Sequence, residues 1–337
     1  GSAGAIVSVS DYTRTFQTNN LTVSANGSEK IGGVQASALL STEGQSATFV
    51  YVDGTEGWIN IQETSNSVTG NDNLIATGGT ITTCGNNKIH TFTGPGTFTV
   101  SQVSACAADN LVSYMVVAAG GGGGGGIAGG GGAGGFREVK APLTPYTASP
   151  LDGYPSAPNR ITVTATAFPI TVGGGGSGGA CVGSPASGGT GGNGNPSIFS
   201  TITSTGGGAG GNVGVVPNTG PGGSGGGASV SGGPKGIGTG DTPPTTPAQG
   251  NDGGLGYCGN NFRSGGGGGA TVAGVASPNG SSGGCGGTGA TTSISASPTS
   301  YSGGGGGGQY NGLPGGGGES PCGTGKAASL VQGVGPN

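Results

Sequence analysis

Uninterrupted runs of glycine constrain this chain more than any other feature. Glycine accounts for 89 of the 337 residues, and the longest blocks are Gly120–Gly126, Gly265–Gly269 and Gly303–Gly308. Such a run has no side chains to bury, and glycine loses more backbone freedom on folding than any other residue. The runs therefore form either a flexible tether or an ordered array in which backbone packs against backbone.

The composition favours the ordered array. Glycine-rich linkers are typically flexible coils, but disordered segments usually combine low hydrophobicity with high net charge. Only 7% of this chain is charged, and the glycine blocks are separated by short inserts that contain apolar residues, proline and cysteine. We therefore predict that the runs are ordered.

The ordered form open to such runs is the polyproline II helix, here built from glycine. It has three residues per turn, rises about 3.1 Å per residue and makes no internal hydrogen bonds. Each buried N–H and C=O must then find a partner on a neighbouring helix. We predict a lattice of many polyglycine II helices, because one hydrogen bond nets only about 1 kcal/mol against an ordering cost of about 1–2 kcal/mol per residue.

The composition changes sharply near Ala119, and the sequence predicts a mainly β and polyglycine II fold with little or no α-helix. We expect an N-terminal β module (1–78), a β meander (79–119) and a glycine-rich polyglycine II domain (120–337). Asp53-Gly54 is a hairpin signal between two of the strands. The strands that we expect are Ile6–Val9, Leu21–Ser24, Ala47–Asp53, Gly57–Gln62, Thr80–Cys84, Lys88–Phe92, Thr97–Val103 and Leu111–Ala118.

Charge and hydropathy exclude several classes of partner. The net charge of −4 and the pI near 4.8 argue against nucleic-acid or anionic-membrane binding through a basic patch. No stretch of 18 apolar residues occurs. The chain begins Gly-Ser-Ala-Gly without Met, so we expect a processed product or the ordered part of a longer chain. Residues 1–63 are short for a self-sufficient core, which favours oligomerisation through the strands.

Six cysteines are compatible with three disulfides. Cys84 and Cys106 flank the meander, where a bridge would staple it. The other four lie beside glycine runs, where a bridge would pin neighbouring helices, and free buried thiols are the alternative. These four are Cys181, Cys258, Cys285 and Cys322.

Neither a metal site nor catalysis finds support in the sequence, and we expect no enzyme activity and no cofactor. No two cysteines are spaced C-x-x-C, and the single histidine, His90, lies within an expected strand, so a zinc site is not expected. Gly323–Lys326 is superficially similar to a phosphate-binding loop, but Ser320 and Ala327 replace residues that such a loop needs.

Several stretches resemble the glycine-rich domain of bacteriophage tail-fibre and receptor-binding proteins, especially those of marine and cyanobacterial phages. They are "KIHTFTGPGTFTV…LVSYMVVAAGGGGGGG", "FPITVGGGGSGG" (168–179) and "NPSIFSTITSTGGGAGG" (195–211). Upstream, "NGSEKIGGV" (26–34) and "STEGQSATFVYVDGTEGWINI" (41–61) resemble the β modules of such fibres. From residue 212 onward only the glycine pattern is similar.

The resemblance implies a virion tail-fibre tip that is extracellular and binds a host cell-surface receptor, either a glycan or an outer-membrane protein. In the tip adhesins of T-even-type long tail fibres, similar runs form a polyglycine II sandwich whose variable loops bind the host. Other tail-fibre or baseplate proteins and a homotrimer through the N-terminal β modules are the further implied partners. The alternatives are a structural or ice-binding polyglycine II protein and a depolymerising tail spike.

If successive glycine runs alternate in direction, the inserts sort onto two ends. With a turn at Ile127-Ala128, the distal end carries 180–187, 212–219, 241–249, 270–282 and 309–314. The proximal end then carries 136–172, 196–205, 257–264, 290–302 and 319–322. If 120–135 is instead one long run, the two ends exchange roles. The receptor-binding candidates of the distal set are Val213, Val215, Val216, Pro217, Asn218, Pro243, Pro244, Asn279, Tyr310 and Asn311.

Overall fold

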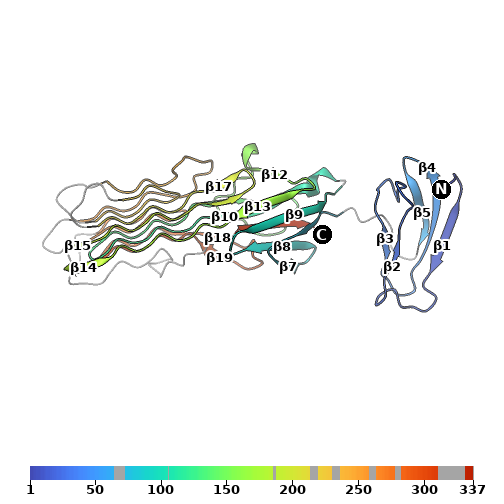
Figure 1. Ribbon diagram of the computed structural model, residues 1–337, viewed down its shortest axis with the longest axis horizontal. Helices are drawn as coiled ribbons and strands as arrows, with labels where there is room; N and C mark the ends of the chain where they lie inside the picture. The colour runs from blue at the N-terminus through green and yellow to red at the C-terminus, as the bar shows by residue number, and fades with distance from the viewer. Residues whose placement is uncertain are drawn as a thin grey trace. The chain divides into compact units, whose positions relative to one another are not determined.

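A computed structural model describes most of the chain (Figure 1) and divides it into two compact units, 1–74 with 102–107 and 75–101 with 108–337. The described residues are 1–63, 73–104, 106–184, 187–212, 219–229, 236–257, 263–277, 282–309 and 331–336. Their regular structure is β-strand with two short 3-10 helices, and no described helix is long and apolar enough to cross a membrane. The mainly β fold class is therefore confirmed.

The first unit consists of two β layers around a small core. The strands β1 (Ile6–Ser10), β4 (Ser46–Asp53) and β5 (Gly57–Glu63) form a sheet in the order β1-β4-β5, and β2 (Leu21–Val23) pairs with β3 (Ala38–Leu40). Burial alternates along β3 and along the first half of β4, as expected of half-buried strands. The core residues that result are Ile31, Ala38, Leu40, Ala47 and Phe49.

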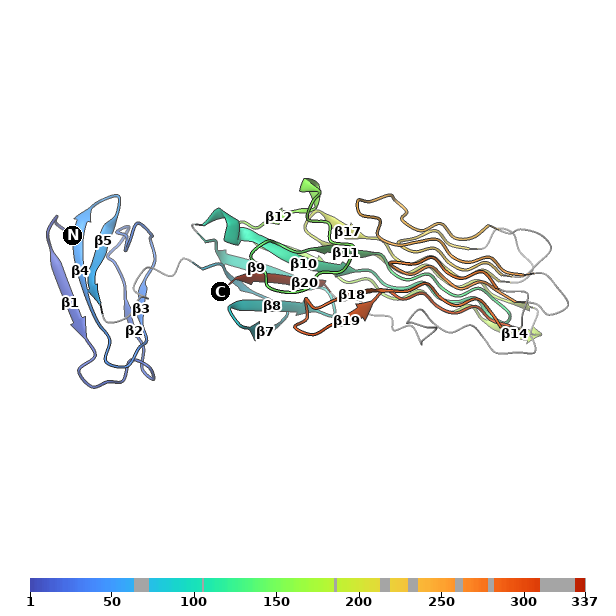
Figure 2. The same ribbon diagram turned by 180° about the vertical axis from the view of Figure 1, so that it is seen from behind.

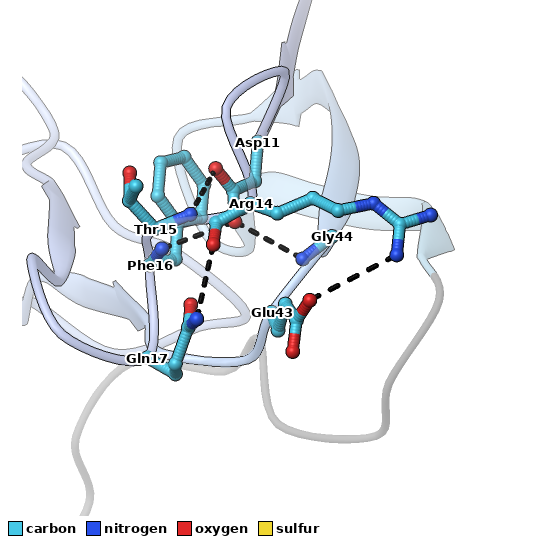
Figure 3. Close-up of polar contacts among 7 residues, drawn as sticks. All are labelled: Asp11, Arg14, Thr15, Phe16, Gln17, Glu43 and Gly44. Carbon is cyan, nitrogen blue, oxygen red and sulfur yellow. Dashed lines mark hydrogen bonds and ion pairs between the residues drawn. The ribbon is translucent and has the colours of Figure 1, made fainter.

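Asp11 ties the segment after β1 to the turn before β4 (Figure 3). Its Oδ1 accepts a hydrogen bond from the Thr15 N–H at 2.9 Å, and its Oδ2 accepts from the N–H groups of Phe16 and Gly44, each at 3.0 Å. Burial alone raises the pKa of this carboxyl, but the backbone donors outweigh burial and hold the pKa below its ordinary value of 3.8. An ionised carboxylate thus closes this end of the unit.

The second unit contains a six-stranded sheet and a five-stranded sheet, which we call the inner and the outer sheet. The inner sheet has the order β11-β10-β20-β8-β7 and the outer sheet the order β17-β16-β13-β9-β6, while β12 (Ile161–Thr162) pairs with β10. The inner strands are β7 (Thr80–Cys84), β8 (Asn87–Phe92), β10 (Leu111–Val117), β11 (Phe136–Val139) and β20 (Val331–Pro336). The outer strands are β6 (Ile75–Thr77), β9 (Gly96–Gln102), β13 (Ala167–Thr171), β16 (Ser197–Phe199) and β17 (Ile202–Ser204).

Alternating residues of the inner sheet are buried on both of its faces. On one face, Tyr114 packs edge-on against Phe199 at 6.0 Å, and His90 packs edge-on against Phe98 at 5.0 Å, so this face meets the outer sheet. The opposite face carries Ile89, Met115 and Val117. It packs against the hairpin of β18 (Ala290–Thr292) and β19 (Thr299–Tyr301) through Ala290, Ile294 and Tyr301.

The predicted meander is wrong in its pairing, although each of its strands forms. β7 and β8 pair with each other, but β9 belongs to the outer sheet, and β20 lies between β8 and β10. In register, Val331 is opposite both Val116 of β10 and Phe92 of β8. The Gly94-Pro95-Gly96 turn thus changes sheets rather than closing a hairpin, because strand β20 supplies the partner that β8 needs on that side.

Beyond β10 the chain contains glycine-rich segments that lie side by side in both views (Figures 1 and 2). Apart from the short pair of β14 (Cys181–Ser184) and β15 (Ser187–Gly188), their hydrogen bonds do not have the pattern of strands. Segment 118–125 bonds to segment 188–195 through every third residue, and to segment 129–135 through another set of every third residue. The first set of N–H to O=C bonds is Ala119–Asn195 (3.2 Å), Gly122–Gly192 (2.8 Å) and Gly125–Gly189 (2.8 Å). The second is Ala118–Gly135 (3.0 Å), Gly121–Gly132 (2.9 Å) and Gly124–Gly129 (3.1 Å).

The third set of positions in segment 118–125 faces yet another neighbour. The carbonyls of Gly120 and Gly123 accept hydrogen bonds from the N–H groups of Gly176 and Gly179, at 3.0 and 2.9 Å. A repeat of three is the period of a polyproline II helix, whereas a β-strand repeats every two residues. The hydrogen bonds therefore follow the period predicted from the sequence.

The close approach of these segments leaves no room for side chains at their contacts. A Cβ added to Gly122 would lie 1.9 Å from the carbonyl oxygen of Ser177, and one added to Gly131 would lie 2.1 Å from that of Gly121. Segment 173–180 lies at the edge of the bundle, where some glycines face no neighbour. Gly173, Gly176 and Gly179 are half-buried. A Cβ added to Gly175, by contrast, would meet nothing within 4 Å.

These contacts predict the effect of adding a single methyl group. We expect Gly122→Ala to destabilise the second unit by about 1–3 kcal/mol, since backbone atoms rather than side chains must move apart. The Tm should fall by about 2–4 °C for each kcal/mol of destabilisation. Differential scanning calorimetry measures this change. The matched control is Gly175→Ala, which we expect to leave the Tm unchanged. Equal Tm values for the two variants would contradict the packing described.

The single histidine predicts a pH dependence of stability. His90 is 3% exposed, and its Nδ1–H donates to the Gly78 carbonyl at 2.8 Å. Burial is the main cause that lowers its pKa below the ordinary 6.5. As the pH falls, His90 is therefore protonated more readily in the unfolded chain than in the folded chain. Its contribution to stability is fully present above pH 6.5 and is lost as the pH decreases.

We expect the Tm of the wild type to fall between about pH 7 and about pH 5. His90→Phe keeps a ring against Phe98 and should remove this component of the pH dependence. An identical pH profile of the Tm in both proteins would show that His90 does not titrate as described.

Candidate functional site

The glycine segments run alternately away from the two sheets and back toward them, which creates two ends. We call the end that joins the strands the sheet end, and the opposite end the far end (Figures 1 and 2). Outward segments are 118–125, 173–180, 205–212, 225–229, 249–256, 272–277 and 302–309. Returning segments are 129–135, 188–195, 219–223, 236–240, 264–269 and 282–289. Their directions follow from parallel and antiparallel bonding between neighbours.

Two of the receptor-binding candidates predicted at the distal end lie at the sheet end of the structure rather than at the far end. Pro243 and Pro244 belong to loop 241–249, which lies at the sheet end, because the Nδ2 of Asn159 donates to the Thr246 carbonyl at 2.6 Å. Conversely, loop 257–264, which we expected at the proximal end, joins two segments at the far end. The prediction of ends by counting glycine blocks is thus wrong for these two loops.

The physical reason is a pair of additional reversals. Segment 219–229 is not one run but turns back at Gly222–Ser224, so that Gly220 and Gly223 bond antiparallel to segment 205–212 while Gly227 bonds parallel to it. A second reversal at Ala270-Thr271 restores the original alternation. The Pro221-Gly222-Gly223 sequence is a turn signal from which the first of these reversals could have been predicted.

The remaining receptor-binding candidates lie outside the described residues, although the described residues that flank them lie at the far end. Asn212 and Thr219 flank the first group, Ser277 and Ser282 flank the second, and Gln309 precedes the third. The candidates themselves are Val213, Val215, Val216, Pro217, Asn218, Asn279, Tyr310 and Asn311.

Side-chain hydrogen bonds hold the bases of the far-end loops. The Nδ2 of Asn212 donates to the Gly188 carbonyl, and the hydroxyl of Ser229 donates to the Asn212 carbonyl. The Ser264 hydroxyl donates to the Ile127 carbonyl at 3.2 Å. These bonds connect neighbouring segments to one another at the far end.

Tyr257 and Arg263 form the described base of one far-end loop. The N–H of Tyr257 donates to the Arg263 carbonyl at 2.8 Å, and Arg263 is also bridged to Gln309. The Arg263 guanidinium lies 6.0 Å from the centre of the Tyr257 ring, and the residue is 7% exposed. An aromatic residue that is 37% exposed is thus presented beside a buried cation, an arrangement that suits contact with a partner molecule.

The sheet-end loop that carries Pro243 is fixed from within. The Asp241 Oδ1 accepts from the N–H groups of Thr245 and Gln249, at 3.0 and 3.1 Å. The fully buried Gln249 donates from Nε2 to the Pro243 carbonyl at 2.9 Å and accepts from the Thr205 N–H at 2.8 Å. Pro243 is thereby held as a structural element of the sheet end.

The cysteines only partly follow the prediction. Cys84 and Cys106 are free and exposed, so the predicted staple is absent. The reason is the change of sheets, because Cys84 ends edge strand β7 of the inner sheet while Cys106 follows β9 of the outer sheet. Cys285 is disulfide-bonded. Cys258 and Cys322 lie outside the described residues, as does the side chain of Cys181 in β14 (Cys181–Ser184).

Metal-ligating groups and buried carboxyls are the remaining chemical features of the described residues. Among them, no group of three or more His, Cys, Asp or Glu residues is placed to hold a metal ion. One deeply buried carboxyl is that of Glu138, which accepts from the Ser149 N–H at 2.9 Å and from the Thr292 hydroxyl at 2.5 Å. Burial raises the pKa of Glu138, and the residue is 2% exposed at the sheet end. A substrate therefore has no access to it.

The comparisons with known proteins agree with the glycine-rich architecture. A family model described as "Glycine-rich domain" matches residues 91–331, which is more than half of the chain. The chain therefore belongs to this glycine-rich domain family. No curated protein and no solved structure matches it significantly.

Proposed function

We propose that this chain is a bacteriophage tail-fibre tip protein, in which glycine segments packed as polyglycine II helices display receptor-binding loops at the far end. Its receptor is a glycan or an outer-membrane protein of the host cell surface, and its location is the tail fibre of the virion. Other fibre or baseplate proteins and a homotrimer formed through the N-terminal unit are the partners that this function requires.

The observation that carries the proposal is the alternation of the glycine segments. It brings both flanks of four inserts that differ from one another in sequence to the far end, namely 213–218, 230–235, 258–262 and 278–281, and Gln309, which precedes 310–330, lies there too. Loops on a rigid scaffold are the usual location of recognition residues. A scaffold of backbone hydrogen bonds imposes little on the loop sequences, so recognition can vary while the fold is kept.

Small polar and aromatic groups at the far end fit the same role. Tyr257 presents a partly exposed ring beside Arg263, and rigid aromatic groups contribute much contact area at a low entropic cost. The described residues bring no pair of accessible carboxylates together at this end, and paired carboxylates are what glycan cleavage usually needs. The depolymerase alternative is therefore the weaker proposal.

One observation favours the ice-binding alternative. Segment 173–180 places Gly174, Gly175 and Gly178 along the edge of the bundle, where a Cβ on Gly175 or Gly178 would meet nothing within 4 Å. Ice binding depends on a flat, regular array of such rows, whereas the inserts of this chain differ in length and sequence. Thermal hysteresis of the purified protein would favour ice binding, and its absence would favour recognition.

The receptor proposal predicts that the purified protein blocks infection of a susceptible host by its phage. Replacing 213–218, 258–262 and 278–281 one at a time by Gly-Ser sequences of equal length should reduce blocking by about tenfold or more in at least one case, because binding energy concentrates in few residues. The readout is the plaque count after preincubation of cells with protein.

The matched control is the same replacement of residues 296–298 in the β18–β19 turn at the sheet end, which should block as well as the wild type. Each protein is first shown to have the wild-type Tm. Full blocking by all three far-end variants would refute a receptor-binding role for these three inserts.

A further inference from the structure

A cavity of about 200 Å³ opens in the first unit, and all of its lining residues belong to that unit. Its floor is apolar and is formed by Val7 and Phe49 of the β1-β4-β5 sheet, Val23 of β2 and the buried Ile31. Trp58 also lines the cavity, and Ala25 and the polar residues Ser24, Asn26 and Glu29 complete the lining. Binding pockets typically combine such an apolar surface with a few placed polar groups.

The indole of Trp58 is held firmly in place. Its Nε1–H donates to the Oε2 of Glu29 at 2.9 Å, and the ring of Tyr51 packs edge-on against it at 5.5 Å with an interplanar angle of 70°. The Cα of Gly1 is so close to both rings that an added Cβ would lie 2.7 Å from Tyr51 and 3.1 Å from Trp58. A side chain fixed in this way loses little freedom when a ligand binds against it.

The polar side chains that line the cavity can form further hydrogen bonds. Glu29, whose side chain is 23% exposed, also pairs through Oε1 with the Gly1 amino group. Each oxygen of an ionised carboxylate accepts more than one hydrogen bond. The Asn26 side chain is exposed and makes no hydrogen bond to the described residues, so its amide can both donate and accept.

We propose that this cavity binds a neutral saccharide ring, as a site separate from the far end of the glycine bundle. A pyranose has one face of C–H groups, which suits the indole and the apolar floor, and a rim of hydroxyls, which suits Glu29 and Asn26. The small volume fits a single ring, because pockets for drug-sized ligands are typically about 300–1,000 Å³.

A purely apolar occupant fits the lining less well. It would remove the Glu29 carboxylate from water without adding to its bonds with Trp58 and Gly1, and it would leave the Asn26 amide covered and unpaired, which is costly. Sugar hydroxyls satisfy both groups, and a hydrogen bond to a charged acceptor is stronger than one between neutral groups. The side chains that face the cavity therefore select a ligand with polar edges and an apolar face.

Trp58 is the only tryptophan in the sequence, so its fluorescence reports on this cavity alone. We expect a saturable change in its emission when the full chain is titrated with methyl glycosides of glucose, galactose, mannose or N-acetylglucosamine. Concentrations up to about 50 mM would reveal a millimolar Kd. Hexanol serves as the apolar probe. The proposal is overturned by the absence of saturation with all four sugars, or by saturation with hexanol alone.

Two variants test the polar contacts. Glu29→Gln should raise the Kd for the sugar by about tenfold, since it removes the charged acceptor. The matched control is Glu43→Gln, which makes the same chemical change at an exposed residue that pairs with Arg14 outside the cavity and should leave the Kd unchanged. Equal Kd values for these two variants would refute the role of Glu29.

Asn26→Ala provides a second measurement if Glu29→Gln does not fold, because the Asn26 side chain makes no bond to the described residues. It should raise the Kd by about threefold to tenfold, and an unchanged Kd would contradict the proposal. Sugar binding and infection blocking are separate readouts on separate units, so either proposal can fail without the other.

Discussion

Backbone hydrogen bonds between side-chain-free segments are the interaction on which the second unit depends. Each bond nets only about 1 kcal/mol, so no segment is stable alone, and order comes from sharing each segment among several neighbours. The three sets of positions in segment 118–125 illustrate this, because each set bonds to a different neighbour. Glycine is required where segments touch, since a Cβ at Gly122 would collide with a carbonyl oxygen.

The two sheets provide the hydrophobic anchor that the glycine segments lack. Strands β8 and β10 of the inner sheet are buried on both faces, by the aromatic residues of the outer sheet and by the β18–β19 hairpin. Strands β10, β11, β13, β16 and β17 adjoin glycine segments, so the sheets fix where those segments begin and end. At the far end, the described loop bases are held instead by hydrogen bonds such as that from Ser264 to Ile127.

Sequence reasoning was most successful where the signal is local. Alternating apolar residues identified β4, β5 and β10, and the glycine composition predicted hydrogen bonds with a period of three. It failed where the outcome depends on distant partners. β20 is a Val-Gln-Gly-Val-Gly-Pro segment without a strong strand pattern, and it forms because β8 and β10 offer two unpaired edges.

The ends of the bundle and the cavity show the same dependence on distant partners. Loop 241–249 was placed at the wrong end because one short reversal at Gly222–Ser224 inverts the direction of the segments after it. The cavity beside Trp58 was not foreseen, since its lining comes from separate stretches of the first unit. Neither outcome has a local sequence signal strong enough to predict it alone.

Residue-resolved amide exchange by NMR tests the central claim most directly. In edge segment 173–180, the N–H groups of Gly176 and Gly179 donate to Gly120 and Gly123, whereas those of Gly175 and Gly178 make no hydrogen bond to the described residues. A bundle bonded through every third residue predicts slow exchange at Gly176 and Gly179 and fast exchange at Gly175 and Gly178. Fast exchange at all four positions, with order parameters typical of a coil, would contradict it.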